Sequence, residues 1–264
     1  MAGRADGRQS AYRERNSTAD RALDILALFG DDRLVITGQE VADQLKVVRS
    51  TAYRYLQSLV SSGFIQEQRP SGYRLGPRVL ELARLARKGI GLSEAARPVM
   101  RALVAEVGET VLLTCRSGSV VVCLERESTD RPVRLSYERG HILPVNAGAS
   151  ALVLLAWAPR EEVESILGVS GLPKLTDATV TDPEQLWSRL EQIRALGYAL
   201  SRGEVDPDVV GIAAPIRDES GAVAAALSVA ALSHHISDER VLTIAAAVDA
   251  AAQEVTRQLI LIAS

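Results

Sequence analysis

The sequence predicts an α+β protein with a small, mainly helical N-terminal domain and a larger C-terminal domain that contains an antiparallel sheet. Three observations support this fold class: two short helical segments before a hairpin, a helical segment that ends at glycines, and later hairpin strands with helices between them. At 264 residues, the chain is long enough for two domains. The expected segments are a disordered basic arm (1–17), a first domain (18–76), a linker helix (77–91) and a second domain (92–264).

The charge is divided unevenly along the chain. Residues 1–90 hold 15 Lys and Arg against 10 Asp and Glu, whereas residues 91–264 hold 15 against 23, within a net charge of −3. A basic segment on an acidic body is typical of an anion-binding module attached to a domain with another role. Chance fluctuation is the alternative on charge alone.

The compartment expected from the sequence is the cytoplasm. Cys115 and Cys123 are too few to suggest a disulfide framework, so we expect reduced thiols. The arginine-rich start has no apolar run behind it, which argues against a secretory signal. No segment approaches the ~20 apolar residues that span a bilayer, so no membrane partner is expected.

Residues 37–75 carry the most informative pattern. A helix is expected over 39–45, a tight connection over 46–48, a second helix over 49–60, and a hairpin over 64–75 with a turn at 70–72. Asp20 is the expected cap of a preceding helix. Together these elements form a winged helix-turn-helix, which holds one helix rigidly enough to enter the major groove of DNA.

The second of these helices has one apolar and one polar face. Ala52, Leu56, Leu59 and Val60 fall on the side expected to pack inward. Arginine, hydroxyl and amide side chains on the other side suit base edges and phosphates. The residues expected to contact DNA are Arg49, Ser50, Thr51, Tyr53, Arg54 and Gln57 in the helix and Arg69 and Arg74 in the wing. The alternative is an amphipathic helix of a protein-interaction module.

The second domain is expected to alternate hairpins and helices. Its expected strands are 110–116, 120–126, 133–136, 198–201, 209–216 and 222–230. Its expected helices are 93–107, 147–157, one opening at Pro159, one over 183–196 after the Asp182 cap, and a long final helix capped by Ser237.

The order and spacing of several motifs resemble the IclR-type bacterial transcriptional regulators over about residues 20–260. The motifs are those at 39–45, 49–56, 63–65, 73–77, 96–98, 108–110, 143–144, 197–198, 213–218 and 225–229. The resemblance implies a GAF-like effector domain and a homodimer, often a dimer of dimers, that binds operator DNA. It also implies control by a small organic acid, aromatic compound or other metabolite. Many members are repressors, which makes repression the expected sign, and some are activators.

The resemblance also implies an effector cup between the sheet and the helix that follows the Leu-Pro segment. The residues assigned to it are Leu135, Leu143, Asn146, Ala149, Ser150, Ser201, Gly211, Ala213 and Ser228. The start of that helix, residues 146–152, lacks the histidine and lysine of many relatives. Gly211 stands where cysteine is common, and Ser201 where an acid is common. A neutral or zwitterionic ligand, such as an amino acid, is therefore as plausible as a carboxylic acid. Close packing is the alternative role for the small residues.

Rival chemistry receives little support from the sequence. Residues 148–152 half-resemble the nucleophile elbow of hydrolases but lack its second glycine. Neither His141 nor the pair His234 and His235 has metal-ligand spacing with the cysteines. We therefore predict no catalytic residue, no metal and no cofactor. A small-molecule sensor or scaffold without DNA affinity remains the alternative function, with a hydrolase behind it.

Overall fold

The structure is a computed structural model that describes residues 18–30, 32–68, 72–129 and 137–263. The chain divides into two compact units, one ending at Ala86 and the other beginning at Arg87, and each is described by itself. The basic arm, the strand expected over 133–136, and the site residues Arg69 and Leu135 lie outside the described residues. No helix in the described ranges is long and apolar enough to cross a membrane.

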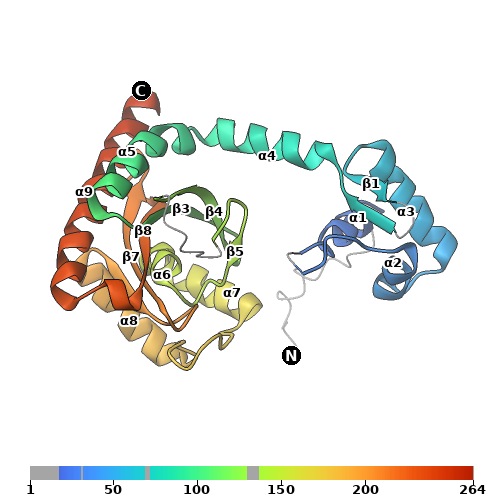
Figure 1. Cartoon of the computed structure of the whole chain (residues 1–264). Coiled ribbons are helices and arrows are strands. Elements are labelled where there is room, and N and C mark those ends of the chain that lie inside the picture. Colours follow the sequence, from blue (N-terminus) through green and yellow to red (C-terminus); the bar gives the residue numbers. More distant parts are fainter. Residues whose placement is uncertain (1–17, 31, 69–71, 130–136, 264) are drawn as a thin grey trace, which may run out of the picture. The chain divides into compact units, whose positions relative to one another are not determined.

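The first unit is a winged helix-turn-helix, as the sequence predicts. Its elements are α1 (Thr18–Leu26), α2 (Gly38–Leu45), α3 (Arg49–Ser61), β1 (Ile65–Gln68) and β2 (Gly72–Leu75) (Figure 1). The expectation for Asp20 is wrong in detail, because α1 already begins at Thr18 and Asp20 lies within its first turn.

Helix α2 has a well-defined start and end. The Glu40 amide donates to Thr37 Oγ1 (3.2 Å), and the Thr37 amide donates to Glu40 Oε2 (2.6 Å), which together form a capping box. The Thr37 amide and the Thr37 hydroxyl (2.9 Å) both donate to the Glu40 carboxylate, which favours its charged form and lowers the pKa of Glu40. Lys46 ends the helix in the left-handed conformation (φ 54°), which turns the chain toward α3.

The wing is attached to the helices by backbone contacts that leave no room for side chains. Ile36 and Tyr73 exchange backbone hydrogen bonds of 2.9 and 2.8 Å. A Cβ on Gly72 would lie 2.3 Å from the Ile36 carbonyl oxygen, and one on Gly76 would lie 2.2 Å from the Gly63 carbonyl oxygen. The two glycines therefore fix the position of the hairpin beside α3.

A single helix runs through the boundary between the two units. Helix α4 spans Pro77–Ile90, close to the linker helix expected over 77–91, and Gly91 (φ 65°) separates it from α5 (Leu92–Val107). The positive φ of Gly91 suits a glycine, which has no Cβ to clash in this region.

The second unit is built on one antiparallel sheet with the order β5-β4-β3-β8-β7-β6. Its strands are β3 (Thr110–Ser117), β4 (Val120–Glu127), β5 (Ile142–Leu143), β6 (Ala199–Arg202), β7 (Val209–Arg217) and β8 (Val223–Leu232). Its other helices are α6 (Ala149–Ala156), α7 (Arg160–Ser170), α8 (Pro183–Leu196), the short 3-10 turn Ser233–His235, and α9 (Asp238–Ala263). The predicted helix over 147–157 is thus slightly shorter in the structure.

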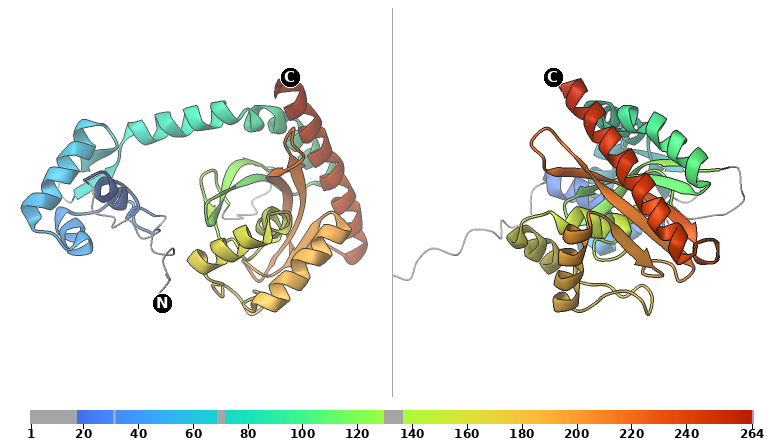
Figure 2. Two further views of the ribbon diagram at one scale, coloured as in Figure 1. Left: turned by 180° about the vertical axis from the view of Figure 1, so that it is seen from behind. Right: turned by 90° about the vertical axis from the view of Figure 1, so that its left-hand side faces the viewer.

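Helices cover both faces of this sheet. Helices α5 and α9 pack on one face around Met100, Leu227 and Val248, and Figure 2 shows α9 crossing the strands. Helix α6 lies on the other face, with α8 packed behind it. All eight residues of α6 are buried, as expected for a helix that is apolar on every side.

The close approach at Gly76 predicts a selective loss of stability in the first unit. We expect Gly76→Ala to lower the free energy of unfolding by about 2 kcal/mol, because the new Cβ would collide with a backbone oxygen. Gly30→Ala is the matched control, since a Cβ there meets nothing within 4 Å. Urea unfolding followed by circular dichroism measures both variants, and equal midpoints for the two would contradict this packing.

Candidate functional site

Helix α3 presents a polar, exposed face on a firmly packed base. Ala52, Leu56 and Leu59 are buried in the core of the first unit, and Val60 packs against it. The opposite face exposes Ser50, Arg54, Gln57 and Ser58. The structure therefore brings these side chains together on one surface, with the wing strands β1 and β2 next to them.

The start of α3 is cationic and open. Its N-cap is Val48, which makes no side-chain capping bond, and the first turn contains no acidic residue. Arg49 is the first residue of the helix and is exposed, while Thr51 is half-buried. Uncapped N–H groups and the helix dipole both favour an anion such as a phosphate at this end.

Three of the predicted DNA contacts have protein partners in the structure. The Tyr53 ring packs on Gly38, and a Cβ on Gly38 would lie 2.8 Å from that ring. Tyr53 therefore also fixes α2 against α3. Gln57 Nε2 donates to Glu67 Oε1 (3.4 Å), and Arg74 Nη2 donates to Gln66 Oε1 (3.2 Å).

The two arginines of α3 are the available cations of this surface. Neither Arg49 nor Arg54 has a carboxylate partner within the described part of the chain. The Arg54 guanidinium lies 5.8 Å from the centre of the Tyr55 ring, a contact that leaves its N–H groups able to donate elsewhere.

The second unit contains a small cavity between the sheet and the start of α6. Its volume is about 50 Å³, which is enough for a few water molecules. Six of the residues assigned to the effector cup line it: Leu143, Ala149, Ser150, Ser201, Gly211 and Ser228.

Two other assigned residues are not in the lining. Asn146 is buried, but its Nδ2 donates to the carbonyl oxygens of Pro173 and Val180 (both 3.3 Å) and so attaches the 173–180 segment to the start of α6. Ala213 lies under α6 in the apolar core.

Polar groups in the cavity come from opposite walls. Ser150 Oγ of α6 and Ser228 Oγ of β8 are 2.8 Å apart and both residues are buried. A Cβ on Gly211 would lie 3.3 Å from the Ala149 Cβ and 3.7 Å from its nitrogen. A larger residue at 211, such as cysteine, would therefore crowd the N-terminus of α6.

Glu204 is a residue of this region that the sequence did not reveal. Its Oε2 accepts the Gly148 amide (3.0 Å), and its Oε1 lies 3.2 Å from Arg189 Nη2. The carboxylate is buried, and this loss of solvent raises its pKa despite those partners. An isolated acid in a loop gives no periodic signal, so only its position after β6 could have suggested this role.

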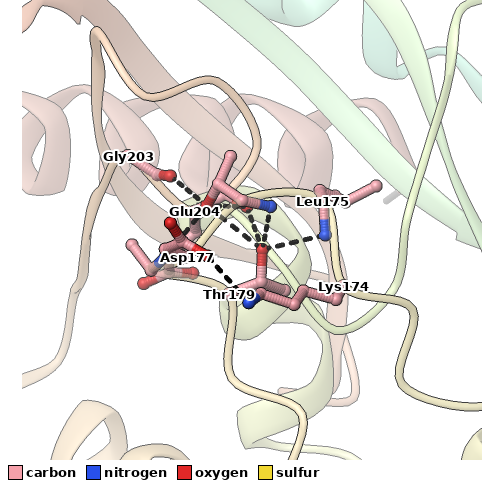
Figure 3. Close-up of polar contacts among 8 residues, drawn as sticks. Lys174, Leu175, Asp177, Thr179, Gly203 and Glu204 are labelled. Carbon is pink, nitrogen blue, oxygen red and sulfur yellow. Dashed lines mark hydrogen bonds and ion pairs between the residues drawn. The ribbon is translucent and has the colours of Figure 1, made fainter.

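The backbone beside Glu204 is held by a loop between α7 and α8. Thr179 Oγ1 donates to the Glu204 carbonyl oxygen (2.7 Å), and Thr176 Oγ1 donates to that of Gly203 (2.6 Å). Figure 3 shows this cluster, with the Leu175 amide donating to Thr179 Oγ1 (3.2 Å) and Lys174 paired with Asp177 (2.7 Å).

The remaining lining residues were missed because most of them come from loops or from apolar strand positions. Tyr137 and Asp206 are the polar ones among them. The others share apolar or small side chains: Leu112, Ala147, Gly148, Ala151, Val205, Val209, Val229 and Ala230.

The geometry gives no support to the hydrolase alternative. The hydrogen-bond partner of Ser150 Oγ is Ser228 Oγ rather than a histidine. His235 Nδ1 instead lies 3.9 Å from Glu109 Oε1. In the described ranges, no group of three or more His, Cys, Asp or Glu residues could hold a metal ion.

The buried carboxylate of Glu204 predicts a pH-dependent contribution to stability. Its raised pKa means that the folded protein holds this proton more tightly than the unfolded chain, whose ordinary value is 4.5. Its contribution should therefore decrease as pH rises from about 4.5. Urea titrations of wild type and Glu204→Gln give the free energy of unfolding of each protein. We expect the wild-type value minus the variant value to fall as the pH rises.

Glu191→Gln is the matched control, because it makes the same substitution at an exposed carboxylate on helix α8. A difference between wild type and Glu204→Gln that stays constant from pH 4.5 to pH 8 would contradict the assignment.

Comparisons with known proteins agree with this arrangement. Residues 18–69 match the IclR helix-turn-helix domain, and residues 85–257 match the bacterial transcriptional regulator IclR C-terminal family. The chain is 35% identical to the HTH-type transcriptional regulator BhcR of Paracoccus denitrificans over 239 residues, covering 90% of this chain and 85% of that protein.

Solved structures show the same fold. An IclR regulator from Silicibacter sp. superposes with a TM-score of 0.83 at 29% identity, covering 92% of this chain and 96% of the other. An IclR homolog from Microbacterium hydrocarbonoxydans in complex with 4-hydroxybenzoate superposes with a TM-score of 0.79 at 31% identity, covering 94% and 100%. The chain belongs to the IclR family of bacterial transcriptional regulators.

Proposed function

We propose that this protein binds double-stranded operator DNA through α3 and its wing, and that a small molecule in the α6 cavity controls this binding. The observation that carries the proposal is the pairing, in one chain, of an exposed cationic helix face with a buried cavity lined by hydroxyl groups. Membership of a family of transcriptional regulators supports the same conclusion.

The free arginines of α3 are the proposed determinants of DNA binding. A guanidinium can donate two hydrogen bonds to one guanine, and Arg54 is exposed in the middle of the polar face. Arg49 and the open N-terminus of α3 suit phosphates. Gln57 and Arg74 can exchange their present partners at little cost, because both bonds are exposed to solvent.

The proposed DNA-binding species is a homodimer, which can pair further into a dimer of dimers. One recognition helix contacts only a few base pairs, whereas two helices on a symmetric dimer can bind two half-sites. The effector would alter the spacing of the two helices by shifting a population of dimer geometries, with α4 as the connecting element. The protein would act in the cytoplasm as a repressor of transcription.

The cavity restricts the proposed effector to a compact molecule. Ser150 provides a hydroxyl group at the start of α6, further polar groups come from Tyr137, Ser201, Asp206 and Ser228, and the other lining residues are apolar or small. An organic acid, an aromatic compound or an amino acid would each place a polar group near Ser150 and Ser228. One relative of known structure holds 4-hydroxybenzoate, a compact aromatic acid.

Replacing Arg54 should separate the two activities. We expect Arg54→Ala to lower affinity for the operator by about tenfold or more, since a bidentate contact with a base contributes about 1–3 kcal/mol. Ligand binding should be nearly unchanged, because Arg54 and the cavity belong to different units. Gel shifts and calorimetry measure the two quantities.

The matched control is Arg101→Ala, which removes an exposed positive charge from α5 of the second unit. A parallel loss of DNA affinity and ligand affinity in Arg54→Ala would contradict the division of labour proposed here.

Filling the cavity should remove the response to the effector and spare DNA binding. We expect Ser150→Trp to abolish the effector response and to leave operator affinity within about twofold, because the indole would occupy the space between α6 and β8. Ser188→Trp on the exposed surface of α8 is the control. An unchanged ligand titration in Ser150→Trp would place the effector elsewhere.

A further inference from the structure

Asp206 is the only charged side chain in the cavity lining within the described part of the chain. It lies in the loop between β6 and β7, where it is exposed to solvent at the edge of the cavity and its Oδ1 accepts the Asp208 amide (3.2 Å). The described residues provide no cationic partner for it. This carboxylate therefore keeps the capacity to accept further hydrogen bonds from a bound molecule.

The start of α6 is the positive end of the same cavity. Gly148 makes no side-chain capping bond for the helix, and its own amide is already bound to Glu204. The next residues, Ala149, Ser150 and Ala151, line the cavity, and their first-turn N–H groups have no intrahelical acceptor.

The serine pair adds a donor at this end. Ser150 is 8% exposed and Ser228 is 3% exposed, and both line the cavity. Two hydroxyl groups that share one hydrogen bond (2.8 Å) use only one of their two protons for it. The other proton has no acceptor among the described residues and can be donated to a ligand in the cavity.

We propose that the effector carries a protonated amino group that pairs with Asp206 and an acceptor group, most simply a carboxylate, that binds at the start of α6. The compound class is an amino acid or a close analogue. This inference rests on the proposed function, because it narrows the ligand of the same cavity.

Charge complementarity explains why an acid without an amino group fits less well. Such a ligand would place its negative charge beside the Asp206 carboxylate, and none of the described lining residues is a cation that could offset it. Tyr137 adds no charge of either sign to the cavity. Burial and, secondarily, Asp206 raise the pKa of its phenol to about 12, so it remains a neutral donor.

The test compares matched pairs of ligands on the full-length protein. The panel contains L-amino acids, the 2-hydroxy acids of the same carbon skeletons (L-alanine with lactate, L-valine with 2-hydroxyisovalerate, L-phenylalanine with 3-phenyllactate), simple carboxylates and neutral aromatic compounds. Thermal shift identifies ligands, calorimetry gives their affinities, and operator binding with each compound is the functional measurement.

We expect at least one amino acid to bind about tenfold or more tightly than its hydroxy acid, since a hydrogen bond to a charged group is strong. Asp206→Asn should reduce that preference to near unity and leave operator affinity without ligand unchanged. Asp208→Asn is the matched control, because Asp208 is exposed like Asp206 but does not line the cavity, and it should keep the preference.

The failures are distinguishable. If only acids or neutral compounds bind and alter operator affinity, or if Asp206→Asn keeps the preference, the amino-group inference is wrong and control by an effector stands. If no compound in the panel binds or alters operator affinity, both the inference and the proposed effector control are rejected.

Discussion

The second unit depends on one packing constraint: an apolar helix buried on every side must begin inside the protein. Burial of all eight residues of α6 leaves its first N–H groups away from solvent, where unsatisfied donors are costly. Glu204 accepts the amide of Gly148, and Arg189 offsets the charge that this brings inside. The residues that follow, Ala149, Ser150 and Ala151, line the cavity, and their N–H groups have no acceptor within the helix. The same constraint that determines the fold of this region therefore supplies a place where a ligand can accept hydrogen bonds.

The first unit solves a different problem, which is to hold a polar helix face rigidly in solvent. The inner face of α3 packs through Ala52, Leu56 and Leu59, and Tyr53 lies against Gly38 of α2. Gly72 allows the wing to approach the backbone of Ile36, and Gly76 allows it to approach the backbone of Gly63. Since these contacts leave Arg49 and Arg54 without carboxylate partners in the described ranges, the helix can present both cations to a duplex.

Much of the fold was predictable from local signals. Asp182 before Pro183 marks the start of α8, and the Asp182 side chain accepts the Gln185 amide (2.9 Å) as expected of a cap. Ser237 likewise accepts the Arg240 amide (3.3 Å) at the start of α9. The hairpin strands β3 and β4 match their expected ranges closely, because alternating apolar residues flank a turn with Gly118.

The cavity was predictable only in part, for reasons of geometry. Strand and helix positions such as Gly211, Ser228 and Ser150 follow from the family resemblance and do line it. Asp206 and Tyr137 come from loops, whose side-chain directions follow no period. Ala213 does not line the cavity, because it lies along β7 beyond Gly211 and packs in the apolar core with α6. Asn146 does not line the cavity, because its side-chain amide donates to the carbonyl groups of Pro173 and Val180.

The central claim is that α3 recognises a particular duplex sequence and that the second unit controls this recognition. Nuclease footprinting of the wild-type protein on the promoter regions of its own gene and of the genes beside it tests this claim most directly. The account predicts two protected half-sites, centred about one helical turn or a multiple of a turn apart, with protection altered by a bound metabolite. Protection no stronger than on random duplex, with or without every metabolite tested, would contradict it.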